Sequence, residues 1–99
     1  MNSARKKQLK AQAHTLKPVI IVGQSGLTES VLKEIEITLD THELIKIKIR
    51  AEKELRNQIS DKIIADTHSE LIQTIGQIIV IYRKKPEPKE EKSAGPRRR

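Results

Sequence analysis

The chain has 99 residues and a formal net charge of +7, which indicates one small domain with a modest core and a polyanionic partner. It contains no cysteine, which excludes disulfides and cysteine-ligated zinc, and its single aromatic residue, Tyr82, argues against RNA-binding sheets that stack bases on exposed rings. No stretch approaches the roughly 18 apolar residues of a membrane span and no secretory signal opens the chain, so we expect a cytoplasmic protein without membrane contact.

Residues 3–14 predict a short basic helix with Ser3 as its N-cap. Leu9 and Ala13 are four residues apart and therefore lie on one face of this helix. Cations cover the rest of its surface: Arg5, Lys6, Lys7 and Lys10. Residues 19–22, VIIV, follow as a wholly apolar, β-branched run, which predicts a strand with little exposure on either face.

A second helix is expected from Thr28, its N-cap, to about Thr41. Its apolar positions repeat at helical spacing: Val31, Leu32, Ile35 and Leu39. Residues 43–50, ELIKIKIR, alternate strictly and predict a half-buried strand. One side of that strand is apolar, with Ile45, Ile47 and Ile49. The other side carries what we call the cationic row: Lys46, Lys48 and Arg50.

A third helix is predicted over residues 53–67, with apolar side chains four residues apart at Leu55, Ile59 and Ile63. Two strands follow, at 70–75 and 77–83, and Gly76 supplies the positive φ that a tight hairpin between them needs. Three prolines and dense charge predict that residues 84–99 form a disordered basic tail.

The predicted order is therefore α-β-α-β-α-β-β, an α/β protein of the two-layer α+β kind with a four-stranded mixed sheet. The first two strands are separated by a helix, so we expect them to be parallel with a right-handed crossover. The last two strands form an antiparallel hairpin. We expect one folded domain over residues 1–83, followed by the tail at 84–99.

The stretch Gly23-Gln24-Ser25-Gly26 joins the first strand to the second helix. Glycines at the carboxyl end of a parallel strand allow close approach of a ligand, and the helix N-terminus that follows attracts anions. The spacing does not fit a Walker P-loop or a dinucleotide fingerprint, whereas it fits the G-x-x-G loop with which KH domains clamp a nucleic-acid backbone. A plain strand-to-helix turn is the alternative interpretation.

Cations surround this loop in the predicted fold. They are Lys17 before the first strand, Arg5, Lys6 and Lys10 on the first helix, and the cationic row on the neighbouring strand. Alternate strand residues are roughly 6.5 Å apart, a spacing that can follow phosphates. The alternative is an ordinary solvated strand face, because lysine is common on exposed strands.

We expect no catalytic site, no metal and no cofactor. The histidines, His14, His42 and His68, are far apart in sequence and lack partners at ligand spacing. Ser25 does not lie in a G-x-S-x-G motif, and a chain this short has little room for a catalytic triad. A small-molecule substrate is therefore not expected, and we expect a monomer.

Three segments together resemble one known family: LKAQAHTLKPVIIVGQSGLTESVLKEI, HELIKIKI and IGQIIVIYR. They are similar to the CRM domain, the chloroplast RNA splicing and ribosome maturation domain, in its stand-alone bacterial YhbY form. The resemblance covers about residues 5–83. It implies a fold similar to the C-terminal domain of translation initiation factor three, with strand order 1-2-4-3. It also implies an added N-terminal helix that would account for the all-apolar first strand.

The resemblance also implies binding to ribosomal RNA in precursors of the large ribosomal subunit. It assigns the phosphate-facing loop to Gly23, Gln24, Ser25 and Gly26, and the surrounding basic surface to Lys17, Lys46, Lys48 and Arg83. KH-type loops often carry Lys or Arg between the glycines, whereas Gln24 and Ser25 are neutral, so backbone amides must supply the contacts there.

Two hypotheses follow for a protein without enzymatic activity. In the first, the protein grips the RNA backbone with the G-x-x-G loop and the basic surface. In the second, the folded domain binds an acidic protein, and only the tails contact RNA.

Overall fold

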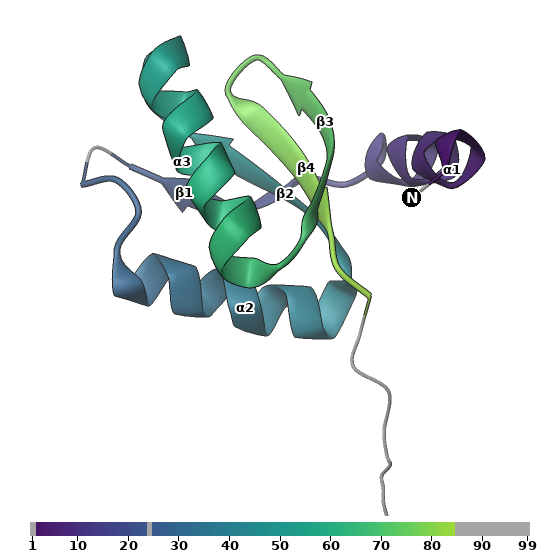
Figure 1. Cartoon of the computed structure of the whole chain (residues 1–99), viewed down its shortest axis with the longest axis horizontal. Helices are drawn as coiled ribbons and strands as arrows, with labels where there is room; N and C mark the ends of the chain where they lie inside the picture. Colours follow the sequence, from purple (N-terminus) through teal and green to yellow (C-terminus); the bar gives the residue numbers. More distant parts are fainter. Residues whose placement is uncertain (1, 24, 85–99) are drawn as a thin grey trace, which may run out of the picture.

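The computed structural model describes residues 2–23 and 25–84, which form three helices and four strands in the predicted order (Figure 1). The elements are α1 (Ser3–Ala13), β1 (Pro18–Val22), α2 (Glu29–His42), β2 (Leu44–Ile49), α3 (Lys53–Thr67), β3 (Glu70–Ile75) and β4 (Ile78–Tyr82). The predicted tail lies outside the described residues from residue 85 onward, as does Gln24.

The four strands form one mixed sheet in the order β1-β2-β4-β3. β1 pairs parallel to β2, and β4 pairs antiparallel to both β2 and β3. This confirms the predicted α+β fold, the parallel first pair and the terminal hairpin. The register brings Lys48 of β2 between Ile21 of β1 and Ile78 of β4, so these three side chains share one face of the sheet.

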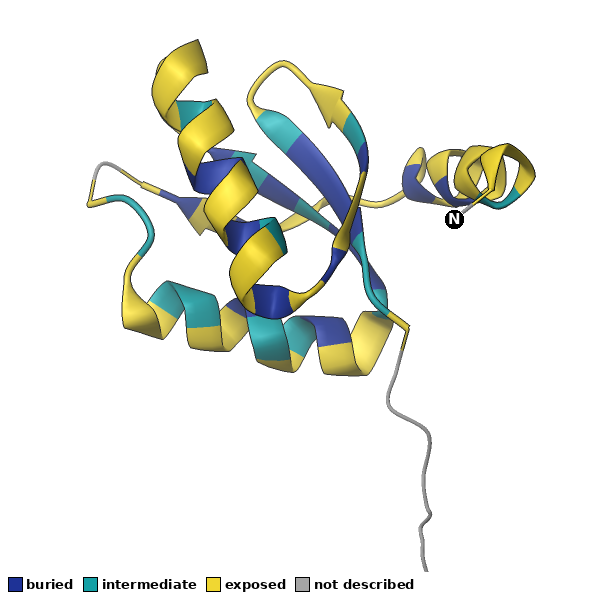
Figure 2. Ribbon diagram, viewed as in Figure 1, coloured by how far each residue is buried: buried dark blue, intermediate teal, exposed yellow. Residues whose placement is uncertain are grey.

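The main core lies between the sheet and the two helices α2 and α3, which cover the same face of it (Figure 1). Its strand residues are Ile20, Val22, Ile45, Ile47, Ile49, Ile79 and Ile81, and its helix residues are Ile35, Leu39, Ile59 and Ile63. The buried stripes of α2 and α3 face the sheet, and their outer faces are exposed (Figure 2). Alternation on the strands and helical spacing on the helices therefore supply one shared apolar layer.

The helix α1 packs on the opposite face of the sheet. Leu9 and Ala13 are each 1% exposed and form a second apolar cluster with strand residues Leu44, Ile72 and Val80. The cap differs from the prediction: Asn2, not Ser3, is the N-cap, and its Oδ1 accepts the Arg5 N–H at 2.8 Å. Asparagine and serine are equally good caps, so composition alone could not separate them.

The expectation that β1 has little exposure on either face is wrong. Val19 is 54% exposed and Ile21 is 56% exposed, and only the alternate residues Ile20 and Val22 enter the core. The physical reason is the position of α1, which contacts β2 and β3 and leaves the edge strand β1 open. Leu55 is also 44% exposed, so only Ile59 and Ile63 of the predicted α3 stripe are core residues.

The end of the sheet is fastened to both helices of the main layer by Arg83, which follows β4. Its guanidinium donates to the Glu36 carboxylate, to Asp40 Oδ1 at 2.8 Å and to the backbone oxygen of Thr67 at 2.8 Å. Burial works to lower the pKa of Arg83, but the hydrogen bonds and charges of Glu36 and Asp40 raise it above its ordinary value. The side chain is only 20% exposed and is permanently charged.

We predict that Arg83→Lys lowers the free energy of unfolding by about 1 to 3 kcal/mol, because one ammonium cannot replace a planar group that serves α2 and α3 together. Chemical denaturation measures this loss. Lys62→Ala is the matched control, since it removes the exposed Lys62–Asp66 pair at 3.0 Å and should cost less than about 0.5 kcal/mol. Equal losses in the two variants would contradict a fastening role for Arg83.

Candidate nucleic-acid interface

The cationic row lies on the face of the sheet that α2 and α3 leave uncovered. Lys46 and Lys48 alternate with the buried residues Ile45, Ile47 and Ile49, so their side chains point away from the main core. Both lysines are half-buried, and Arg50 is exposed just after β2. The row therefore runs along β2 on the same face as α1.

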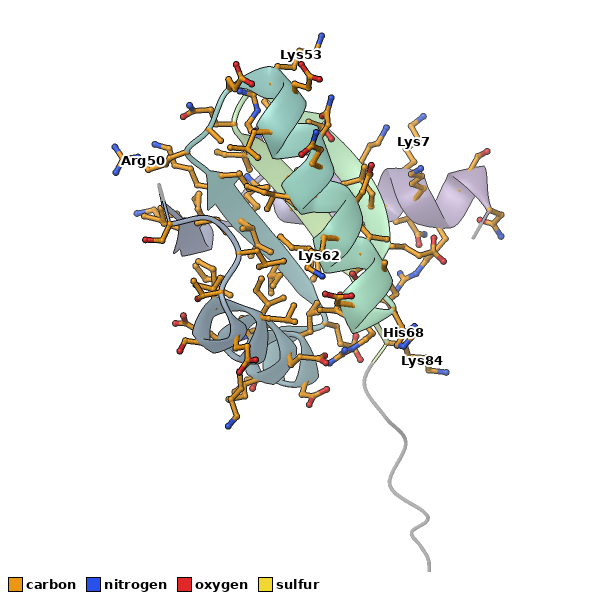
Figure 3. The ribbon with its side chains drawn as sticks, turned by 60° about the vertical axis from the view of Figure 1, so that its left-hand side comes forward. Lys7, Arg50, Lys53, Lys62, His68 and Lys84 are labelled. Atoms are coloured by element: carbon orange, nitrogen blue, oxygen red, sulfur yellow. The ribbon has the colours of Figure 1, made fainter. Side chains whose placement is uncertain are left out.

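The Gly23–Gly26 loop lies beside the Arg50 end of this row. The Arg50 N–H donates to the backbone oxygen of Val22 at 2.9 Å, which holds the end of β2 against the start of the loop. Figure 3 shows Arg50 next to this loop, with Lys7 on α1 at the other side of the molecule. The two parts of the predicted site, the loop and the cationic row, are thus adjacent.

The loop itself is a tight turn closed by one hydrogen bond. The Gly26 N–H donates to the Gly23 oxygen at 3.0 Å, and Gly26 has a φ of +76°. This N–H is therefore already engaged within the turn, and Gly26 is needed for its left-handed conformation. Gly23 and Ser25 are exposed, and Gln24 lies outside the described residues.

In contrast to Gly26, no conformational or packing requirement among the described residues explains a glycine at position 23. Its φ is not positive, and an added Cβ would meet no atom within 4 Å. Neither backbone strain nor packing inside the described part of the chain demands a glycine there. The absence of a side chain at position 23 leaves room for a ligand to approach the backbone closely.

The helix α2 begins directly after this loop and presents its positive end there. Thr28 caps the helix as predicted, with its Oγ1 accepting the Val31 N–H at 3.2 Å. The N–H groups of Glu29 and Ser30 have no acceptor among the described residues, as expected for a first helical turn. These donors favour an anion, whereas the Glu29 side chain in the same turn repels one.

Lys17 and Lys46 lie at the far end of the row from the loop. Lys17 is exposed in the connection between α1 and β1. The Lys46 Nζ donates to the backbone oxygen of Leu16 at 3.0 Å, so this lysine also holds the connection in place. Two of its N–H donors remain for other acceptors.

The cations of α1 divide into two kinds. Lys6 and Lys10 are exposed and line a shallow hollow with Ser3 and Lys7. Lys7 was not among the predicted site residues, although it is an exposed cation of the same helix as Lys6 and Lys10. Arg5 is half-buried, and its guanidinium carbon lies 5.5 Å from the centre of the Tyr82 ring, so it packs against the sheet.

The predicted site residue Arg83 is not brought together with the others. Its guanidinium is occupied by Glu36, Asp40 and Thr67, at the end of α2 opposite to the loop. Arg83 therefore has a structural role, and it does not belong to the surface formed by the loop and the cationic row.

Acidic residues are concentrated in the helical layer. Nine of the ten acids between residues 19 and 82 lie on α2 or α3 or adjoin them: Glu29, Glu34, Glu36, Asp40, Glu43, Glu52, Glu54, Asp61 and Asp66. The tenth, Glu70, begins β3. The same layer carries four bases, Lys33, Lys53, Arg56 and Lys62, so its acids outnumber its bases and we call it the acidic helical layer. The charged strand residues near the loop are all cationic, so the charge distribution differs between the two faces of the sheet.

Residues 2–23 and 25–84 contain neither a candidate metal cluster nor a candidate membrane span. These residues include no cluster of three or more histidines and acids that could hold a metal ion. None of their helices is long and apolar enough to cross a membrane.

A G-x-x-G loop beside a cationic sheet face is an arrangement suited to an anion. The sequence matches the CRS1 / YhbY (CRM) domain over residues 1–83. The chain belongs to this family. A Pseudomonas aeruginosa protein named "Probable RNA-binding protein" is 46% identical over 89 residues, which cover 89% of this chain and 86% of the relative.

A second relative, from Haemophilus influenzae, is named an RNA-binding protein. It is 44% identical over 90 residues, which cover 90% of this chain and 91% of the relative. The solution structure of a Staphylococcus aureus protein superposes with a TM-score of 0.76 at 34% identity, covering 91% of this chain and 95% of that protein. The fold is therefore shared with a solved structure over nearly the whole chain.

Proposed function

We propose that this protein binds RNA without catalysing a reaction, using the Gly23–Gly26 loop and the cationic row as one surface. The observation that carries the proposal is the charge separation across the sheet. The row runs to the loop on a face away from the acidic helical layer, so a polyanion meets this face first. The names of the relatives from two bacteria support RNA as that polyanion.

In this proposal the loop and the start of α2 hold a phosphate through backbone N–H groups. The N–H groups of Glu29 and Ser30 have no acceptor among residues 2–23 and 25–84, and Gly23 allows the backbone to come close. The loop carries no cation of its own, so Arg50, which is tied to Val22, is the nearest charge of the row along the sheet. Lys48, Lys46 and Lys17 continue the path along the strand.

The RNA we propose is ribosomal RNA in precursors of the large ribosomal subunit, in the cytoplasm. This finer assignment is supported by the family resemblance of the three sequence segments and by membership of the CRM family. The cations form an extended path with one charge at each position. Such a path suits an RNA backbone whose course is already fixed by the fold of a partly assembled particle.

The salt dependence of RNA binding tests the cationic row. The logarithm of the affinity should fall with the logarithm of the salt concentration by about 0.7 to 0.9 per phosphate neutralised. We predict that Lys48→Ala reduces this slope by about one unit, because one phosphate contact is lost. Fluorescence anisotropy titrations with a fragment of large-subunit ribosomal RNA over a range of salt concentrations give the slopes.

Lys33→Ala is the control for this measurement, since Lys33 is an exposed lysine on the acidic helical layer and its loss should leave the slope unchanged. The same titration with residues 1–83 alone addresses the alternative. If the shortened protein has no measurable RNA affinity, the domain is an interaction module for an acidic protein, and only the tail contacts RNA.

The two glycines of the loop should respond differently to alanine. We predict that Gly23→Ala leaves the free energy of unfolding unchanged and weakens RNA binding about tenfold or more, because a charge-assisted hydrogen bond to phosphate is worth about 1.5 to 3 kcal/mol. Gly26→Ala should lower the free energy of unfolding by about 1 to 2 kcal/mol, since its φ is positive. Unchanged RNA affinity in a stable Gly23→Ala variant would rule out backbone contact at the loop.

Sedimentation of a cell extract through a sucrose gradient tests the ribosomal assignment. We predict that the protein migrates with particles smaller than the mature large subunit, and that Lys48→Ala with Arg50→Ala shifts it toward the free fraction. Migration of the native protein only as free protein would refute the ribosomal assignment. RNA binding itself is tested separately by the titrations.

A further inference from the structure

A cleft of about 350 Å³ opens at the end of the cationic row that is far from the loop. It lies where α1, the connection to β1, the end of α2 and the beginning of β2 meet. Its lining residues are Gln12, Leu16, Lys17, Val19, His42, Leu44, Ile45 and Lys46. Its volume falls within the roughly 300 to 1,000 Å³ of small-ligand clefts.

The walls of this cleft are apolar, and its polar groups can all donate hydrogen bonds. Val19 is 54% exposed, Leu16 is 37% exposed, and Leu44 forms a nearly buried wall at 8%. The polar lining consists of one amide, one imidazole and two ammonium groups, with no carboxylate among the lining residues. A matching ligand has flat apolar faces for the walls, a polar edge for the hydrogen-bond donors and an adjoining negative charge for the ammonium groups.

The cleft is held in shape by a contact within the protein. The Lys46 Nζ donates to the backbone oxygen of Leu16 at 3.0 Å, which ties one wall to β2. Leu9 and Ala13 anchor the preceding helix on the sheet, so the Gln12 side of the cleft is fixed as well. Little ordering is then required when a ligand enters, which favours affinity.

We propose that this cleft binds one unpaired base of the RNA, and this inference rests on the proposed function. The base would insert between Leu16 and Val19, as extruded bases do between apolar side chains elsewhere. The Gln12 amide can hydrogen-bond the base edge, and Lys17 and Lys46 can hold the flanking phosphates. A chain with one aromatic residue can thus bind a base without ring stacking.

The position of the cleft connects it with the phosphate site. Pro18 pairs with Lys46 near the cleft, and Val22 pairs with Ile49 near the loop. The five residue steps from Pro18 to Gly23, along β1 and just past its end, span about 16 Å. A single RNA strand that follows the cationic row would therefore pass from a backbone contact at the loop to a base contact at the cleft.

The test compares a short single-stranded RNA of mixed sequence with inorganic polyphosphate, a polyanion that has no bases. We expect Leu16→Ser to weaken RNA binding about tenfold, the scale of losing apolar contact in a pocket. Polyphosphate affinity and the salt slope should not change, because no charge is removed. Gln12→Ala is a second, conservative variant, and it should also weaken RNA binding alone.

Ile37→Ser is the matched control, since Ile37 is 60% exposed on α2, away from the cleft. RNA carrying 4-thiouridine should also crosslink, on irradiation, to peptides containing residues 12–19 or 42–46. The proposal is overturned if the cleft variants bind RNA as tightly as the control, or if they lose polyphosphate affinity equally. Absence of RNA binding by the native protein would overturn the proposed function as well, so the two failures are distinguishable.

Discussion

The structure depends on the strict alternation of isoleucine and lysine in β2. This strand is paired on both sides, with β1 and β4, so its register is set from two directions. Ile45, Ile47 and Ile49 complete the main core, and each is at most 2% exposed. A slip of one residue would bury Lys46 and Lys48 in that core, which is prohibitively unfavourable for unpaired charges. The same alternation that builds the core therefore aims the cationic row outward.

The charge separation of the molecule follows from this arrangement. Because α2 and α3 pack on the isoleucine side, the acids that decorate them are kept on that side as well. Arg83 reinforces the layer by joining the end of β4 to Glu36, Asp40 and Thr67, and so neutralises part of its negative charge internally. The opposite face has α1 with its lysines at one end and the Gly23–Gly26 loop at the other. The sheet thus lies between a layer with an excess of acids and a face on which cations predominate.

The open face is more than a row of cations. Val19 and Ile21 of the edge strand β1 are exposed, and Ile21 lies beside Lys48 in the parallel register. Apolar side chains between cations can contact the sugars and bases of a strand whose phosphates pair with the lysines. In the proposed binding mode, backbone donors at the loop make a contact that does not depend on sequence, and the apolar cleft near Lys46 makes a contact with a base.

The sequence by itself determined what depends on neighbours along the chain. Helical spacing, strand alternation, an apolar β-branched run and a hairpin glycine predicted all seven elements. Thr28 was correctly taken as a cap, and Gly76 as the hairpin residue with positive φ. Only the tertiary structure decided which apolar residues stay uncovered, as Val19 shows, and which cations find internal partners, as Arg83 shows. The physical reason is that exposure and pairing depend on where α1 and α2 dock, which is set by contacts between residues distant in sequence.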